Sequence, residues 1–217
     1  MTLVKICGLT EPARIEQACA AGADYVGFVF FPASRRYVTP EQAGVLAGHV
    51  SGTVESVGLF VNPDDRIIET TLLSVPLDVI QLHGEESPER VAEIGLRFGV
   101  RTLKALPVAV PEDLQAVAAY ADTADMILFD AKPVPGAVLP GGNGLPFDWR
   151  LLEQVEIDCP WLLAGGLTVD NLSTALAVTG APGVDVSSGV ETSPGVKDPA
   201  KLAAFIAMAK SFGRNDG

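Results

Sequence analysis

The chain has 217 residues, of which 48% are hydrophobic and 19% are charged, and its formal net charge is −12 at pH 7. This composition is typical of a globular protein with a large core, and the acidic balance argues against nucleic acid as a partner. The longest apolar stretches, such as Tyr25 to Phe31, are far shorter than the roughly 18 residues that a membrane span requires, so no membrane partner is expected.

Eight apolar, β-rich runs alternate with helix-like segments along the chain. Most are about 22 to 24 residues apart, and they begin near Leu3, Tyr25, Val54, Leu77, Arg101, Asp125, Pro160 and Gly183. Alternating strands and helices predict a parallel sheet, and eight such units can close into a barrel. We therefore expect an α/β protein with one (β/α)₈ TIM barrel of eight parallel strands and outer helices, a single domain over residues 1–217. An open, doubly wound sheet is the alternative.

Prolines and capping residues mark the expected ends of the helices. The first helical turns are expected at Pro12, Pro40, Pro63, Pro88, Pro111 and Pro199. The side chains just before them suit N-caps, at Thr10, Thr39, Asn62, Ser87 and Asp198. Three glycines lie where helices should end, at Gly22, Gly99 and Gly180.

The first strand ends with a reactive residue type. Alternation along Leu3 to Gly8 places Lys5 and Cys7 on the same face, with Cys7 at the mouth of the barrel. A nearby cation lowers the pKa of a thiol and favours the thiolate, so Cys7 is a candidate catalytic residue. The alternative is a small buried hydrophobic residue, the ordinary role of a free cysteine.

Two later strands end in other ionisable residues. Asp130 follows four apolar residues and precedes no helix, so we interpret it as a carboxyl at the pocket floor rather than a cap. Burial beside Phe and Leu side chains would favour its protonated form, as a general acid needs. His83 ends another strand, where a histidine is more often structural than catalytic. It has no partner at metal-ligand spacing and neither nucleotide-binding glycine motif occurs, so no metal and no cofactor are predicted.

Small residues end the last two strands, in Trp161 to Leu167 and in Gly183 to Gly189. Glycine and serine there let backbone N–H groups approach an anion, and the phosphate site of many (β/α)₈ barrels lies after strands seven and eight. We therefore predict a phosphate site formed by the amides of Gly166, Ser188 and Gly189. Two ordinary turns rich in small residues are the alternative.

Several short motifs occur together in one order from the first strand to the last. They are Lys5-Ile6-Cys7-Gly8-Leu9-Thr10, Gly27-Phe28-Val29-Phe30, Phe60-Val61-Asn62, Gln81-Leu82-His83-Gly84, Leu128-Phe129-Asp130, Ala164-Gly165-Gly166-Leu167 and Asp185-Val186-Ser187-Ser188-Gly189-Val190-Glu191. The set resembles the phosphoribosylanthranilate isomerase family of tryptophan biosynthesis.

That resemblance implies an Amadori rearrangement of N-(5-phosphoribosyl)anthranilate to 1-(2-carboxyphenylamino)-1-deoxyribulose 5-phosphate. It assigns Cys7 as the general base, Asp130 as the general acid and Arg36 as the group that binds the anthranilate carboxylate. The remaining expected substrate-binding residues are His83, Gly165, Gly166, Asp185, Ser187, Ser188 and Gly189. No partner other than this small-molecule substrate is expected. No strand-edge or coiled-coil signal favours a dimer, so we expect a monomer. The odd count of three cysteines and the lack of a signal-like segment in Met1 to Leu9 favour a cytoplasmic location.

Two loops depart from the usual family pattern, and both follow strands where a substrate would lie. Ser34-Arg35-Arg36 stands in place of Ser-Pro-Arg, so either arginine could face the carboxylate. Asn143, within Gly141 to Gly144, stands in place of threonine.

Two other functions compete with the isomerase. An indole-glycerol-phosphate synthase would carry a catalytic lysine on strand one and a glutamate on strand two, but Tyr25 to Phe31 contains no carboxylate. A non-catalytic module that binds a phospho-ligand would need neither Cys7 nor Asp130.

Overall fold

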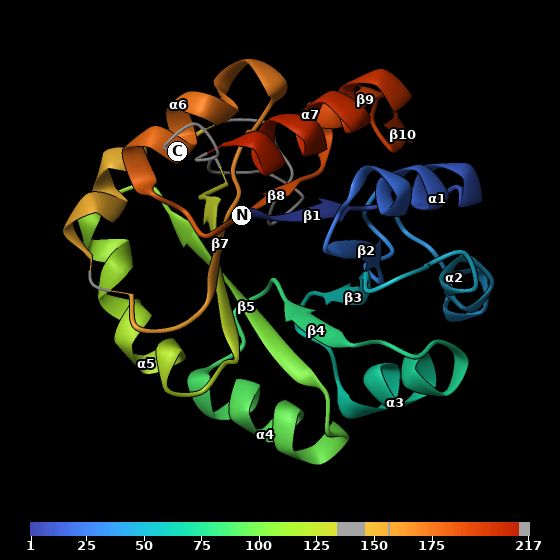
Figure 1. Ribbon diagram of the computed structural model, residues 1–217. Helices are drawn as coiled ribbons and strands as arrows, with labels where there is room; N and C mark the ends of the chain where they lie inside the picture. Colours follow the sequence, from blue (N-terminus) through green and yellow to red (C-terminus); the bar gives the residue numbers. More distant parts are fainter. Residues whose placement is uncertain (134–145, 156, 213–217) are drawn as a thin grey trace.

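Eight parallel strands close into a barrel in the order of the sequence. The computed structural model describes residues 1–133, 146–155 and 157–212. The strands are β1 (Leu3–Cys7), β2 (Tyr25–Val29), β3 (Glu55–Phe60), β4 (Val79–Leu82), β5 (Arg101–Val108), β6 (Met126–Ala131), β7 (Trp161–Leu163) and β8 (Gly183–Val186). Strand β1 pairs with β2 on one side and with β8 on the other, which closes the sheet. The predicted (β/α)₈ barrel is therefore confirmed, and the open sheet is excluded (Figure 1).

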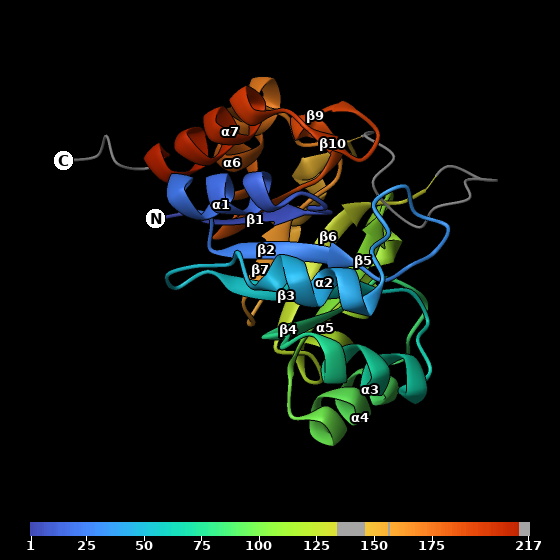
Figure 2. The same ribbon diagram turned by 90° about the vertical axis from the view of Figure 1, so that its right-hand side faces the viewer.

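Helices surround the barrel and connect its strands (Figure 1). The α-helices are α1 (Pro12–Ala21), α2 (Pro40–Ala47), α3 (Asp65–Ser74), α4 (Pro88–Phe98), α5 (Val117–Ala121), α6 (Val169–Thr179) and α7 (Pro199–Ser211). Short 3₁₀ helices occur at η1 (Pro111–Ala116), η2 (Trp149–Gln154) and η3 (Ser188–Val190). A small antiparallel hairpin, β9 (Glu191–Ser193) and β10 (Val196–Lys197), lies on the side where the barrel strands end (Figure 2). Within the described ranges, no helix is long and apolar enough to cross a membrane.

The predicted helix starts are mostly confirmed, with two errors. Prolines begin α1, α2, α4 and α7, and the side chains of Thr39, Ser87 and Asp198 accept the predicted capping hydrogen bonds. Pro111 begins a 3₁₀ helix, and Gly22, Gly99 and Gly180 are the C-caps of α1, α4 and α6.

The prediction for α3 was wrong, because Asp64 caps this helix and not Asn62. Asn62 instead adopts a left-handed backbone, with φ of 47°, and its side chain accepts a hydrogen bond from the N–H of Glu85. The prediction for Thr10 was also wrong, since Glu11 occupies the N-cap of α1 without a side-chain capping bond.

The strand side chains divide into two apolar layers and a polar end. Residues facing the helices form the larger core, which includes Ile6, Phe28 and Phe129. Residues facing the barrel axis form a second cluster, which includes Val79 and Leu128. Because side chains alternate along a strand, the inward series ends in polar residues at the carboxyl ends, namely Cys7, Gln81, Asp130 and Asp185. The polar ends of the inward series therefore define the candidate site.

Candidate active site

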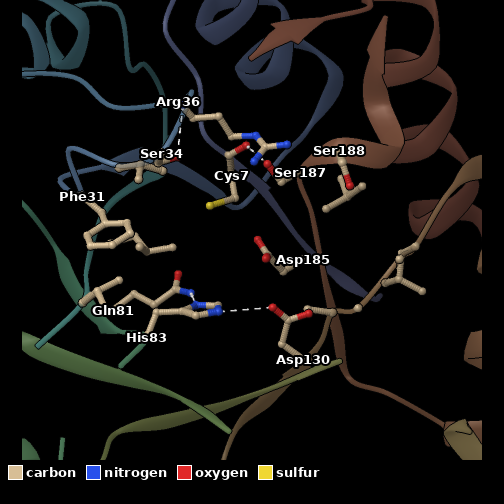
Figure 3. Close-up of a pocket in the computed structure, with 18 residues that line it drawn as sticks. Cys7, Phe31, Ser34, Arg36, Gln81, His83, Asp130, Asp185, Ser187 and Ser188 are labelled. Carbon is tan, nitrogen blue, oxygen red and sulfur yellow. Dashed lines mark hydrogen bonds and ion pairs between the residues drawn. The ribbon is translucent and has the colours of Figure 1, made fainter. Parts of the chain in front are cut away.

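A pocket opens at the carboxyl ends of the strands and gathers nearly all the predicted site residues (Figure 3). The space inside it, with the open solvent at its mouth included, is about 700 Å³. The predicted residues that line it are Cys7, Arg36, His83, Asp130, Gly165, Gly166, Asp185, Ser187 and Ser188. Gly189 is predicted for the same site but is not among the lining residues.

Cys7, Arg36 and Asp185 line one side of the pocket, and Lys5, Glu191 and Lys197 pair with lining or neighbouring residues behind it. We call these six residues the β1–β8 wall. As predicted, Lys5 and Cys7 project to the same side of β1, and Lys5 Nζ lies 2.7 Å from Asp185 Oδ1. A Cβ atom on Gly27 of β2 would lie 3.3 Å from Cys7 Sγ and 3.4 Å from Lys5 Nζ. The missing side chain at Gly27 thus leaves room for the thiol and the ammonium group to lie together.

The thiol is not activated in the way that the sequence suggested. Burial raises the pKa of the Cys7 thiol above its ordinary value, and the nearby Asp185 carboxylate raises it further. The ammonium groups of Lys5 and Lys197 lower the pKa, but they do not outweigh burial. Cys7 in the free enzyme is therefore mainly a neutral thiol near pH 7, with Lys5 placed to stabilise the thiolate when it forms.

The structure distinguishes the two arginines of the loop between β2 and α2. Arg36 is buried and lines the pocket, whereas Arg35 is exposed and does not line it. The Nε and Nη2 atoms of Arg36 donate to the two carboxylate oxygens of Glu191, at 2.8 and 2.9 Å. The fork that the resemblance assigns to a substrate carboxylate is thus already paired on one edge, and Nη1 lies on the other edge.

Gly8 makes this placement possible. It has a φ of 74°, and a Cβ atom there would lie 2.5 Å from Arg36 Cδ, so a side chain at this position would displace the arginine.

Glu191 and Lys197 support the site from behind its lining, and the sequence interpretation did not identify them. Lys197 Nζ lies 2.8 Å from Glu191 Oε1 and donates to the backbone oxygen of Ser187 at 2.9 Å. Burial lowers the pKa of the Lys197 ammonium group. Burial by itself would raise the pKa of Glu191, but the nearby Arg36 and Lys197 stabilise its carboxylate, and the net result is a lowered pKa. Glu191 closes the last family motif, so its position was a usable signal. Lys197 has no such signal, because only the hairpin brings it back to the site.

The opposite side of the pocket, the β4–β6 wall, carries Gln81, His83 and Asp130 (Figure 3). His83 Nδ1 lies 2.9 Å from Gln81 Nε2, and His83 Nε2 lies 3.2 Å from Asp130 Oδ2. Asp130 Oδ1 accepts a hydrogen bond from the N–H of Ala131 at 2.8 Å. Asp130 caps none of the helices that the structure describes, and its carboxyl group faces the pocket as the sequence predicted.

Two glycine-containing loops form the end of the pocket beside β7 and β8. Gly165 and Gly166 both have left-handed backbones, with φ of 80° and 63°. Asn171 of α6 donates from Nδ2 to the carbonyl oxygen of Gly166 at 3.0 Å, which fixes the orientation of this loop. A Cβ atom on Gly189 would lie 1.8 Å from the carbonyl oxygen of Leu167, so this glycine lets the loops after β7 and β8 pack together.

The segment Gly141 to Gly144, with Asn143, lies outside the described residues. Among the residues that the structure does describe, no three His, Cys, Asp or Glu side chains come together in a way that could hold a metal ion.

The amino-acid sequence is similar to those of known proteins of one enzyme family. The family model described as N-(5'phosphoribosyl)anthranilate (PRA) isomerase matches residues 4–208. The chain is 61% identical over 206 residues to N-(5'-phosphoribosyl)anthranilate isomerase of Paracoccus denitrificans (strain Pd 1222), covering 95% of this chain and 96% of the relative. It is 52% identical to the protein of the same name from Paramagnetospirillum magneticum, covering 95% and 96% of the two chains.

Solved structures show the same similarity in three dimensions. The crystal structure of phosphoribosyl anthranilate isomerase from Thermotoga maritima matches with a TM-score of 0.88 and 37% identity, covering 98% of this chain and 100% of that one. A phosphoribosyl anthranilate isomerase in complex with reduced 1-(o-carboxyphenylamino)-1-deoxyribulose 5-phosphate matches with a TM-score of 0.83 and 35% identity, over the same shares of the two chains. A third match, with a TM-score of 0.83, 36% identity and again the same shares, contains monomers of the dimeric T. maritima enzyme.

Proposed function

The chain belongs to the N-(5'-phosphoribosyl)anthranilate isomerase family, an isomerase family of tryptophan biosynthesis, and from this premise we propose how its pocket performs the reaction. Cys7 is the general base and Asp130 is the general acid of an Amadori rearrangement. The substrate is N-(5-phosphoribosyl)anthranilate, and the product is the 1-deoxyribulose 5-phosphate that one related structure holds in reduced form.

The observation that carries this proposal is the placement of the two groups on opposite walls of one pocket (Figure 3). A sugar between them presents its ring oxygen to one wall and its C2 hydrogen to the other. Asp130 transfers a proton to the furanose ring oxygen, and the bond from that oxygen to C1 opens to give a Schiff base. The Cys7 thiol releases its proton to water to give the thiolate that Lys5 stabilises. This thiolate takes the proton from C2, and the resulting enolamine tautomerises to the ketone. Acid and base groups in different environments suit these two steps.

The ends of the pocket suit the two charged ends of the substrate. The Nη1 edge of Arg36 can donate to the anthranilate carboxylate while Glu191 holds the other edge in place. Phe31 and Leu59 supply an apolar surface for the aromatic ring. At the other end, the amides of Gly166, Ser188 and Gly189 bind the phosphate, and the loop geometry at Gly166 supports this assignment. His83, Gly165, Asp185 and Ser187 complete the substrate surface.

A turnover assay that follows the loss of substrate fluorescence tests the two catalytic assignments. Cys7→Ala and Asp130→Asn should each lower kcat by at least ~10²-fold, the usual scale of acid–base catalysis. Cys7→Ser should stay severely impaired, because a hydroxyl ionises far less readily than a thiol. Cys19→Ala, in α1 and away from the pocket, and Asp170→Asn, exposed on α6, are the matched controls and should leave kcat unchanged. If Cys7→Ala kept more than about a tenth of the wild-type kcat, Cys7 would not be the general base, and His83 would be the first candidate for that role.

We also propose that the protein is a monomer and that it is located in the cytoplasm. Because a related enzyme from T. maritima is dimeric, sedimentation of this chain is the direct test of the first.

A further inference from the structure

Gln81 is buried completely at the floor of the pocket, and its amide is only half satisfied. Its Nε2 atom meets His83 Nδ1 at 2.9 Å, but within the described part of the chain its buried Oε1 atom has no hydrogen-bond partner. A buried acceptor without a partner is costly, and a native structure keeps few of them. Because Gln81 lines the pocket and contacts His83, which in turn pairs with Asp130, a role in the chemistry of that pair would account for the unpaired oxygen.

The present arrangement fixes where the proton of His83 lies. When Gln81 Nε2 donates to Nδ1, the neutral imidazole carries its hydrogen on Nε2, which faces Asp130 Oδ2 at 3.2 Å. Asp130 is then a carboxylate, and it also accepts the N–H of Ala131. This is the His83–Asp130 pair without the proton that ring opening consumes.

When the His83–Asp130 pair gains one proton, His83 Nδ1 changes from a hydrogen-bond acceptor to a hydrogen-bond donor. If the proton stays on the imidazole, both ring nitrogens carry hydrogen. If Asp130 holds it and donates to Nε2, the hydrogen of the neutral ring moves to Nδ1. In either case Nδ1 needs an acceptor, and a 180° rotation of the carboxamide presents Oε1. Glutamine serves both states because one end of its amide donates and the other accepts.

We propose that Gln81 is a positioning residue that lets the His83–Asp130 pair hold the proton for ring opening and release it. This inference rests on the proposed role of Asp130 as the acid. During ring opening the proton passes from the pair to the furanose oxygen, and the charge of the pair changes from zero to −1. The carboxamide turns as His83 Nδ1 changes from donor to acceptor, and water returns one proton to the pair before the next turnover.

The other charged groups around this wall are already held by partners. Across the pocket, Asp185 on β8 pairs with Lys5, and Arg36 pairs with Glu191. Behind the end of β4, Lys104 of β5 pairs with Glu86 at 2.7 Å. The thiol of Cys7 on β1 is the other titratable group that lines the pocket within the described ranges. The His83–Asp130 pair can therefore change its charge without breaking an existing ion pair.

The test combines ¹⁵N NMR of histidine with kinetics, using the whole chain and no substrate for the NMR. The sequence has two histidines, so a His49→Gln variant assigns the signals of His83. Wild-type His83 should carry its hydrogen on Nε2 at high pH and gain one on Nδ1 as the pH falls. Gln81→Glu, which only accepts at neutral pH, should hold the Nδ1 hydrogen to higher pH. In Gln81→Met the side chain is only a weak hydrogen-bond acceptor, so His83 should lose its Nδ1 hydrogen at a lower pH than in the wild type. Each displacement should be at least about one pH unit.

The same displacements should appear in kcat/KM against pH, at the inflection that Asp130→Asn removes. Gln115→Glu, which adds the same charge at an exposed position of η1, should move neither readout. A wild-type Nδ1–H tautomer at high pH would overturn the proposal without any variant. The proposal would also be overturned if Gln81→Glu and Gln81→Met shifted the pH dependence of the NMR signals and of kcat/KM in the same direction. A change in KM alone would overturn it too, because that is the effect expected of a residue that binds the substrate directly.

The proposed function fails separately, because it depends on the activity of Asp130→Asn and not on the state of His83 in the free enzyme.

Discussion

The two walls of the pocket satisfy their polar groups in different ways. On the β1–β8 wall every charged group has a partner of opposite sign within 2.9 Å, in the pairs Lys5–Asp185, Arg36–Glu191 and Lys197–Glu191. On the β4–β6 wall the contacts are fewer, the His83–Asp130 distance is 3.2 Å, and Gln81 Oε1 has no partner among the described residues.

This difference suggests a division of labour. A fully paired, buried ionic network resists change, because removal of one member leaves an uncompensated charge. Such a wall can hold the thiol and Arg36 in fixed positions. An incompletely paired wall can change its protonation at small cost, as a proton donor must. Four substitutions test the comparison, in order of expected effect.

The largest effect should come from removing the shared carboxylate of the β1–β8 wall. Glu191→Leu leaves Arg36 and Lys197 buried without their counter-charge, and loss of one partner of a buried pair costs about 3–5 kcal/mol. The free energy of unfolding from urea titration should fall by that amount. As a control, Arg150→Leu breaks an exposed pair with Asp148, leaves that residue as the N-cap of η2, and should leave the titration midpoint nearly unchanged. Equal midpoints for the two variants would mean that the network does not hold the wall together.

The second substitution separates the two arginines. Arg36→Met should remove a charge-assisted hydrogen bond to the substrate of about 2 kcal/mol, which is roughly a 30-fold loss in kcat/KM. Glu191 keeps Lys197 as a partner in this variant, so the fold should persist. Arg35→Met, at an exposed position, should have little effect on kcat/KM. The opposite ranking would show that Arg35 binds the carboxylate.

The third substitution tests the phosphate end, where backbone amides rather than charged side chains line the pocket. Gly166→Ala should raise KM about tenfold, because a Cβ at a φ of 63° shifts the loop and weakens an amide hydrogen bond to the anion. Gly180→Ala is a matched control, since Gly180 has a φ of 60° and open space around it. Both variants should lose similar stability, but only the first should change KM. An equal KM in both variants would remove Gly166 from the phosphate site.

The smallest effect concerns the thiol itself. The Asp185 carboxylate contributes to the raised pKa of Cys7, after the larger contribution of burial. Asp185→Asn should therefore lower that pKa and increase the alkylation rate of Cys7 by iodoacetamide near neutral pH, as read on the Cys7 peptide by mass spectrometry. Asp170→Asn, exposed on α6, should leave the rate unchanged. A slower reaction in Asp185→Asn would show that the carboxylate supports the thiolate instead.

The sequence by itself determined the architecture and most of the site. Eight strand–helix units of similar length are a repeating local pattern, and closure at eight follows from their number. Strand alternation placed Lys5 and Cys7 on one face, because this depends only on residues two positions apart. The position of Asp130 after four apolar residues, with no helix start behind it, indicated a carboxyl in the pocket. The order of short motifs also identified the family. The N-caps at Thr10 and Asn62 failed because several polar residues near each helix start compete for the same role.

Only the tertiary structure decided how the site residues pair and titrate. Arg36 and Glu191 are 155 positions apart, and no local pattern predicts that one neutralises the other. The direction of the Cys7 pKa depends on burial by the whole barrel, and this outweighs the adjacent lysine that the sequence revealed. His83 directly follows β4 and Asp130 lies on β6, and β5 separates these two strands, so closure and curvature of the barrel bring the side chains together. Local periodicity fixes which face a side chain takes, whereas distance, desolvation and hydrogen-bond satisfaction depend on the assembled barrel.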